Sequence, residues 1–256
     1  MLDMSEQSPF VSIHILGVRV DAVTYRVVLD IIAQWIQQRT PHQIATTNPE
    51  FVMAAQQNAA FRQTLQQADL CVADGIGLLW AARRLGQRLP ERVTGSDLVP
   101  LVASQAAQRG WRLFLLGAAP GVAEQTARQL EQQNPGLRIA GVYAGSPDAA
   151  DAPAIVARVQ AAQPDVLFVA YGAPAQDLWI ARHKAELGVP VLMGVGGAFD
   201  HLVGVQRRAP VWLQRVHLEW LFRLVTQPWR WRRQLALPRF VWAVLRQGRR
   251  AAETTA

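Results

Sequence analysis

Apolar stretches rich in β-branched residues alternate with amphipathic, helix-like stretches along most of the chain. The apolar runs predict strands at residues 11–16, 43–47, 70–73, 112–116, 138–143, 165–170 and 189–195. The stretches between them predict helices at residues 22–38, 49–67, 77–85, 95–109, 122–133, 153–162 and 174–187. Continuous apolar strands separated by helices are typical of a parallel sheet that is buried on both faces. The pattern therefore predicts an α/β fold, Rossmann-like, with a mostly parallel sheet and helices on both faces.

The pattern changes after residue 205, where prolines punctuate the chain. Pro210, Pro228 and Pro238 each suit the first turn of a helix, so three short helices are expected. The first of them carries an apolar face of residues spaced four apart: Trp212, Val216, Trp220 and Leu224. We therefore divide the chain into an α/β catalytic domain at 1–205 and a short helical C-terminal appendage at 206–250.

Charge and aromatic residues follow the same division. The 256 residues carry a formal charge of +7, and half of them are hydrophobic, which is ample for a packed core. Residues 1–205 have 15 basic and 17 acidic groups, whereas residues 206–256 have 11 arginines against Glu219 and Glu253. Five of the nine tryptophans also lie between Trp212 and Trp242. The chain thus joins a near-neutral body to a basic, tryptophan-rich tail.

Several broad classes are disfavoured by residues that the chain lacks. The single Cys71 cannot form an intramolecular disulfide, and its apolar neighbours predict a buried side chain. No apolar run approaches the roughly 18–20 residues that span a bilayer. Residues 1–9 carry Asp3 and Glu6 and no basic group, unlike a signal peptide. These features predict a cytoplasmic protein.

Nucleotide and metal motifs are missing as well. Lys184 is the only lysine and lies in no Gly-x-x-x-x-Gly-Lys motif, which excludes a Walker-type ATPase. Trp80 stands where a dinucleotide fingerprint starting at Gly75 would need its third glycine, so NAD-dependent hydride transfer is disfavoured. The five histidines are scattered, and there is no Asp-x-Asp pair. We expect no cofactor and no metal, so arginine would have to neutralise a diphosphate substrate.

Polar residues that follow predicted strands are the candidates for chemistry, because ligands of open α/β sheets bind beyond the carboxyl ends of strands. Asp74 follows the strand at 70–73, and small neighbours leave room for a substrate whose hydroxyl it could deprotonate. Thr46 and Asn48, at the end of strand 43–47, could bind a polar ligand. Ordinary helix capping by Asn48 or Asp74 stays an alternative.

Further candidates follow the later glycine turns. Gln176 and Asp177 come after Gly172, and Asp200 comes after the stretch 196–199, so each could contact a base or a sugar. A glycine turn of this kind is by itself weak evidence, since any strand-to-helix connection can contain one.

A set of short motifs recurs in a fixed order through the chain. They are Ala45-Thr46-Thr47-Asn48-Pro49-Glu50, Ala73-Asp74-Gly75-Ile76-Gly77, Arg92-Val93-Thr94-Gly95-Ser96-Asp97, Gly172-Ala173-Pro174-Ala175-Gln176-Asp177, Gly194-Val195-Gly196-Gly197-Ala198-Phe199-Asp200, Arg207-Arg208-Ala209-Pro210 and Leu218-Glu219-Trp220-Leu221-Phe222-Arg223-Leu224. Together, from about residue 13 to 245, they resemble the WecG/TagA/CpsF family of bacterial glycosyltransferases.

The resemblance implies an inverting, metal-independent transfer of a hexose-type sugar from a UDP-sugar to a polyprenyl-diphosphate-linked sugar. The Thr-x-Asn form at residues 46–48 resembles the branch that transfers N-acetylmannosamine from UDP-ManNAc to GlcNAc-diphosphate-polyprenyl lipid. Such enzymes serve cell-surface polysaccharide or teichoic-acid-type synthesis. Another donor, UDP-glucose or UDP-ManNAc-uronic acid, is the alternative within the family.

The resemblance also assigns roles by position. It implies that Asp74 is the catalytic base, with Thr46, Asn48 and Gln176 beside it. Arg92 and Asp200 correspond to residues that line the nucleotide-sugar pocket. The appendage residues Arg223, Arg230 and Arg233 correspond to arginines that close over the active site. Asp177 is one departure, since glutamate is more usual after the glutamine.

The tail is expected to be both an active-site lid and a peripheral membrane contact at the inner face of the cell membrane, because Trp and Arg on short helices suit an interface. Its apolar faces could instead complete the core or form a homo-oligomer interface. Two other classes stay open: nucleic-acid binding through the tail, which leaves the strand-end acids unexplained, and a non-catalytic UDP-sugar-binding membrane scaffold. We expect no nucleic-acid partner.

Overall fold

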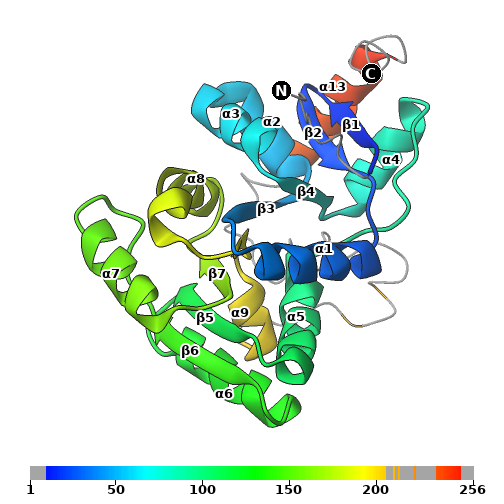
Figure 1. Cartoon of the computed structure of the whole chain (residues 1–256). Helices are drawn as coiled ribbons and strands as arrows, with labels where there is room; N and C mark the ends of the chain where they lie inside the picture. The colour runs from blue at the N-terminus through cyan, green and yellow to red at the C-terminus, as the bar shows by residue number, and fades with distance from the viewer. Residues whose placement is uncertain (1–9, 206–209, 211–212, 214–221, 223–234, 249–256) are drawn as a thin grey trace, which may run out of the picture.

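A six-stranded parallel sheet lies at the centre of the molecule (Figure 1). The computed structural model describes residues 10–205, 210, 213, 222 and 235–248. In spatial order the strands are β4 (Leu70–Ala73), β3 (His42–Thr47), β8 (Val191–Gly194), β7 (Val166–Ala170), β5 (Arg112–Gly117) and β6 (Arg138–Tyr143). Every neighbouring pair is parallel. The predicted α/β fold with a parallel sheet is confirmed.

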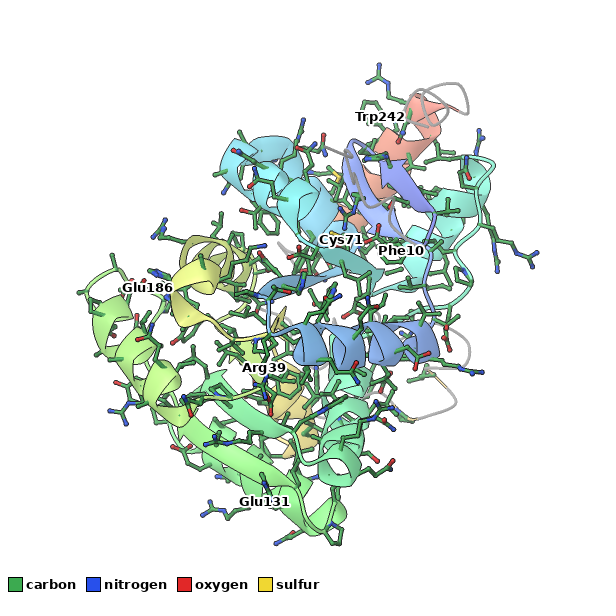
Figure 2. The ribbon with its side chains drawn as sticks, viewed as in Figure 1. Phe10, Arg39, Cys71, Glu131, Glu186 and Trp242 are labelled. Atoms are coloured by element: carbon green, nitrogen blue, oxygen red, sulfur yellow. The ribbon has the colours of Figure 1, made fainter. Side chains whose placement is uncertain are left out.

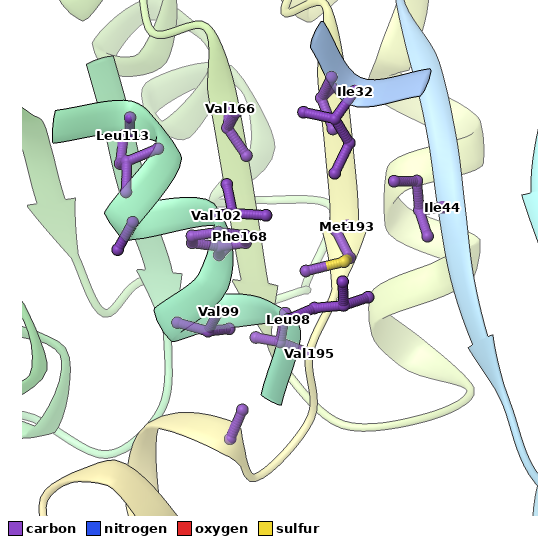
Figure 3. Packing of buried hydrophobic residues seen from close by; sticks show 14 of the residues in the cluster. Ile32, Ile44, Leu98, Val99, Val102, Leu113, Val166, Phe168, Met193 and Val195 are labelled. Carbon is purple, nitrogen blue, oxygen red and sulfur yellow. The ribbon is translucent and has the colours of Figure 1, made fainter. Parts of the chain in front are cut away.

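Helices cover both faces of this sheet, as predicted. The helices on one face are α1 (Tyr25–Gln38), α5 (Gly95–Arg109), α6 (Val122–Gln133) and α9 (Ala198–Leu202). Those on the other are α2 (Pro49–Gln57), α3 (Ala59–Gln67), α4 (Ile76–Arg84), α7 (Ala152–Ala162) and α8 (Ala175–Leu187). Successive strand residues point to opposite faces, so a continuous apolar strand serves both cores. Figure 3 shows one of these cores, where Phe168 and Met193 of the sheet meet Val102 of α5.

The first predicted strand does not join the sheet. β1 (Ser12–Ile15) pairs in antiparallel fashion with β2 (Val18–Asp21), which the hydrophobic pattern did not predict. Leu16 and Gly17, with φ of 52° and 75°, form the two-residue turn between them. The expectation was incomplete because Leu16 gives no turn signal. The Asp21 carboxylate, 2.7 Å from the backbone nitrogen of Cys71, attaches the hairpin to edge strand β4.

Two helix boundaries also differ from the sequence pattern. Asn58 divides the helix expected at 49–67, because its extended backbone ends α2 and its side chain caps α3 by accepting from the Phe61 N–H at 3.0 Å. The five-residue helix α9 was not predicted, since it is too short for a periodic pattern. Cys71 is fully buried, as predicted (Figure 2), and burial raises the pKa of its thiol to about 12.

The last described helix, α13 (Ala236–Gln247), packs against α2 and α4. The helix begins at Ala236, two residues before the start expected at Pro238, so Pro238 lies in its first turn. Phe240 and Val244 are buried against the body, and the Gln247 side chain accepts from the Leu16 N–H at 2.9 Å. The other two helices expected in the tail lie outside the described residues.

Candidate active site

The candidate residues converge at the carboxyl ends of the strands. β4, β3, β8 and β7 are consecutive in the sheet, so the segments that follow them lie next to one another. These segments carry Asp74, Asn48, Gly196 and Gly172 respectively. The connection after β3 leads outward to edge strand β4, whereas β8 leads to α9, which packs against α5 and α6. Connections that diverge in this way predict a ligand crevice at the carboxyl ends of the strands.

Asp74 is the first residue after β4. Its backbone N–H donates to the Thr47 carbonyl at 2.7 Å, and its Oδ2 accepts from the Gly95 N–H at 3.1 Å. Gly95 is the first residue of α5, so the carboxylate faces the positive end of a fifteen-residue helix. Asp74 is only partly buried. A half-buried carboxylate at such a position can accept a proton from a bound hydroxyl.

Close helix packing around Asp74 depends on glycine. Gly75 has φ of 142°, and a Cβ there would lie 3.3 Å from Pro49 Cδ. A Cβ on Gly77 would lie 2.7 Å from Pro49 Cγ, closer than any side chain tolerates. The two glycines therefore let the start of α4 lie directly against the start of α2. This contact brings Asp74 and Asn48 close together at the carboxyl ends of β4 and β3.

Thr46 and Asn48 both have structural partners. The Thr46 hydroxyl donates to the Gly194 carbonyl at 3.0 Å and ties β3 to β8. Asn48 is the N-cap of α2, since its Oδ1 accepts from the Phe51 N–H at 3.0 Å. The capping alternative for Asn48 is confirmed. Contact of either side chain with a ligand stays a prediction.

Gln176, in the first turn of α8, joins the loops that follow β7 and β8. Its Oε1 accepts from the Gly172 N–H at 3.1 Å and from the Gly196 N–H at 2.9 Å. Its side chain lies flat on β8, because a Cβ on Gly194 would be 2.6 Å from its Nε2. The residue is buried. Gln176 therefore fixes the relative position of the loops after β7 and β8.

Asp177 lies in the interior rather than at the crevice, so the expectation that it contacts a base or sugar is wrong. It is fully buried, and its carboxyl oxygens have no hydrogen-bond partner of good geometry among the described residues. Burial raises the pKa of Asp177 to about 7, although the nearby Gln176 side chain and its own backbone N–H partly offset this effect. Near neutral pH, a large fraction of this carboxyl is protonated.

Arg92 and Asp200 both lie near the carboxyl ends of sheet strands, Arg92 near the end of β4 and Asp200 after β8. Arg92 precedes Val93, whose N–H donates to the Ala73 carbonyl at 2.9 Å, so this loop runs beside the end of β4. Asp200 is on α9, directly after the β8 loop, and burial raises the pKa of its carboxyl. Both are partly buried. Arg223, Arg230 and Arg233 lie outside the described residues.

Residues near Asp74 that the sequence reasoning did not single out form a small network. Tyr25 accepts from the Thr94 N–H at 2.9 Å, and its hydroxyl lies 3.2 Å from Asp97 Oδ2. The Thr94-x-x-Asp97 spacing is a capping-box signal that could have marked the start of α5. Nothing in the local sequence around Tyr25 indicates its contact with a residue 69 positions away.

Neither a cluster of metal ligands nor a membrane-spanning helix is present in the described part of the chain. No group of three or more His, Cys, Asp or Glu side chains within it could hold a metal ion. None of its helices is long and apolar enough to cross a membrane.

Comparison with known proteins places the whole arrangement in a family. The model of the glycosyl transferase WecG/TagA/CpsF family matches residues 13–254. The N-acetylglucosaminyldiphosphoundecaprenol N-acetyl-beta-D-mannosaminyltransferase of Bacillus spizizenii (strain ATCC 23059 / NRRL B-14472 / W23) is 37% identical over 82% of this chain and 81% of its own. The protein of the same name from Staphylococcus aureus (strain MRSA252) is 31% identical over 97% and 98%. The chain is therefore a glycosyltransferase and belongs to the WecG/TagA/CpsF family.

Proposed function

We propose that this glycosyltransferase moves N-acetylmannosamine from UDP-ManNAc to a GlcNAc-diphosphate-polyprenyl lipid, with inversion and without a metal. The names of the Bacillus and Staphylococcus relatives support the transferred sugar and the acceptor. The observation that carries the proposal is the position of Asp74, whose carboxylate lies at the carboxyl end of β4 and faces the start of α5.

In the proposed reaction, Asp74 takes the proton from the acceptor hydroxyl as that oxygen attacks the anomeric carbon. The bond between this carbon and the UDP β-phosphate oxygen breaks on the opposite face, which inverts the configuration. UDP leaves with the electron pair, so its developing negative charge needs a nearby cation. Arg92 is a candidate for this role, together with the appendage residues Arg223, Arg230 and Arg233.

Thr46, Asn48 and Gln176 support the same mechanism as a framework. Each fixes a loop that contributes to the crevice: Thr46 holds β3 to β8, Asn48 begins α2, and Gln176 joins the loops after β7 and β8. We assign Asp200 to the nucleotide-sugar pocket, because α9 directly follows the loop after β8. A rigid framework of this kind keeps the base and the leaving group in one geometry.

We further propose that residues 206–250 form an appendage that binds the inner surface of the cell membrane and closes over the site on the 1–205 domain. The outer face of α13 supports this proposal. Trp242 is 60% exposed at the periphery of the molecule (Figure 2), next to exposed Val241 and Leu245, and the Arg246 guanidinium lies 4.2 Å from the Trp242 ring. Apolar and cationic groups on one helix face suit a headgroup interface.

The test is acceptor-dependent UDP release from UDP-ManNAc with the GlcNAc-diphosphate-lipid and EDTA present. Asp74→Asn should lower kcat roughly 10²–10⁴-fold, the usual contribution of a general base. Asp30→Asn, which changes an exposed carboxyl on α1, is the matched control and should leave turnover unaltered. NMR of the product reports the anomeric configuration.

Three results would contradict parts of the proposal. Loss of turnover in EDTA would contradict metal independence. Turnover only with UDP-glucose or UDP-ManNAc-uronic acid would replace the donor. UDP binding without turnover of any of the three donors would support the scaffold alternative instead.

A further inference from the structure

A network of hydrogen bonds links the Asp74 carboxylate, through the start of α5, to Tyr25 on α1. The immediate partner of this carboxylate is the backbone N–H of Gly95, 3.1 Å from Oδ2. This hydrogen bond fixes one carboxylate oxygen and so the plane of the group. The orientation of Asp74 therefore depends on where the first turn of α5 lies.

The first turn of α5 is fixed by a reciprocal cap. The Thr94 hydroxyl donates to Asp97 Oδ2 at 2.8 Å, and the Asp97 N–H donates to the Thr94 hydroxyl at 3.2 Å. The Thr94 hydroxyl thereby satisfies the Asp97 N–H, one of the backbone groups that the helix itself leaves without a partner. The Gly95 N–H lies between the two capping residues in sequence and points instead to Asp74.

Tyr25 anchors this cap to the body of the protein. Its hydroxyl accepts from the Thr94 N–H at 2.9 Å and donates to Asp97 Oδ2 at 3.2 Å. Burial raises the pKa of Tyr25 to about 12, so the phenol keeps its proton and stays a donor. The backbone N–H of Tyr25 in turn donates to Glu91 Oε2 at 2.9 Å, which ties the start of α1 to the loop before Thr94.

Gly95 is also confined from the opposite side. A Cβ at this position would lie 3.2 Å from Thr46 Cγ2, so the start of α5 rests directly on the end of β3. Tyr25 on one side and Thr46 on the other leave the Gly95 N–H little freedom to move away from Asp74. Both contacts come from elements distant in sequence.

We propose that Tyr25, Thr94 and Asp97 are positioning residues for the catalytic base: they hold the Gly95 N–H against Asp74 Oδ2 and thereby keep the carboxylate oriented. This inference rests on the proposed role of Asp74. Loss of the Gly95 contact would leave Asp74 with a higher pKa and a less defined direction toward the acceptor hydroxyl.

The test compares Tyr25→Phe, Thr94→Val and Thr94→Ser with wild type, in the full-length protein and across a pH range. Tyr25→Phe and Thr94→Val should each lower kcat about tenfold, while KM for either substrate changes by less than about twofold. The acid limb of the pH profile should move to higher pH in both variants. Thr94→Ser restores the hydroxyl and should recover most of the lost kcat.

Tyr143→Phe is the matched control. Tyr143 ends β6, at the opposite edge of the sheet from β4, and its ring packs under Arg158 at 4.3 Å. Removing this hydroxyl should leave both kcat and the acid limb as in wild type. A merely structural role of Tyr25 would lower the melting temperature and leave the acid limb in place.

The outcomes separate this inference from the proposed function. If Asp74→Asn is inactive but Tyr25→Phe and Thr94→Val keep the wild-type kcat and acid limb, the positioning role is overturned and the base remains. If wild type and Asp74→Asn release UDP at equal rates, the assignment of the base itself fails, and the positioning role fails with it.

Discussion

Replacing Asp177 by asparagine should stabilise the protein at alkaline pH. Asp177 is fully buried between α8 and the sheet, where a Cβ on Gly194 would lie 3.0 Å from its Oδ1. The change keeps the shape of the side chain and removes the ability to ionise. The variant should therefore resemble the protonated wild type at every pH.

The size of the effect follows from the pKa of this carboxyl. Burial raises it from 3.8 to about 7 in the folded protein. The folded state therefore binds the proton more tightly than the unfolded state, and wild-type stability falls as pH rises from about 4 to about 7. Each pKa unit is worth about 1.4 kcal/mol, so the full penalty is about 4 kcal/mol above pH 7. Between pH 5 and pH 8.5 the cost grows by roughly 2–3 kcal/mol.

Urea unfolding of wild type and Asp177→Asn at pH 5 and pH 8.5 measures this penalty. The variant should gain roughly 2–3 kcal/mol more over wild type at pH 8.5 than at pH 5. Asp30→Asn, on the exposed side of α1, should show no such pH dependence. An equal effect of Asp177→Asn at both pH values would contradict this prediction, because it would mean that Asp177 is already ionised at pH 5 in the folded protein.

Three further changes test other parts of the structure. Phe240→Ala should weaken the docking of α13 by about 3–5 kcal/mol, seen as faster hydrogen exchange across Ala236–Gln247 while the sheet stays protected. Trp242→Ala should reduce binding to anionic vesicles roughly tenfold in a sedimentation assay without lowering the melting temperature, since this ring is 60% exposed. Gln163→Gly should stabilise the protein by about 1 kcal/mol in urea unfolding, because Gln163 is exposed and has φ of 46°. Unchanged exchange, unchanged vesicle binding or a lower urea midpoint, respectively, would contradict these expectations.

The fold was largely predictable because each central strand is apolar on both faces. Residues 43–47, 70–73 and 165–170 alternate with helical patterns, and only a parallel sheet covered on both sides buries them all. The hydrophobic pattern did not predict the β1–β2 hairpin. Its turn contains Leu16 at a φ of 52°, a residue whose type gives no sign of a turn.

The candidate site was predictable in outline for a similar reason. The carboxyl ends of parallel strands all lie on the same side of the sheet, so polar residues that follow the strands, such as Asp74 and Gln176, gather there. What each side chain does there depends on neighbours from other elements. Gln176 uses its Oε1 on two loop N–H groups, whereas the adjacent Asp177 points into the interior.

The α/β class, the near-neutral body with its basic tail, and the strand ends that carry candidate polar residues could all be read from the amino-acid sequence alone. The support of Asp74 by Gly95, the support of Gly95 in turn by Tyr25, and the full burial of Asp177 became visible only in the three-dimensional structure. The physical reason is distance along the chain. Periodicity and capping are local and can be read within one element, but hydrogen bonds between α1, β4 and α5 join residues far apart in sequence, and the burial of a carboxyl is set by everything that packs around it.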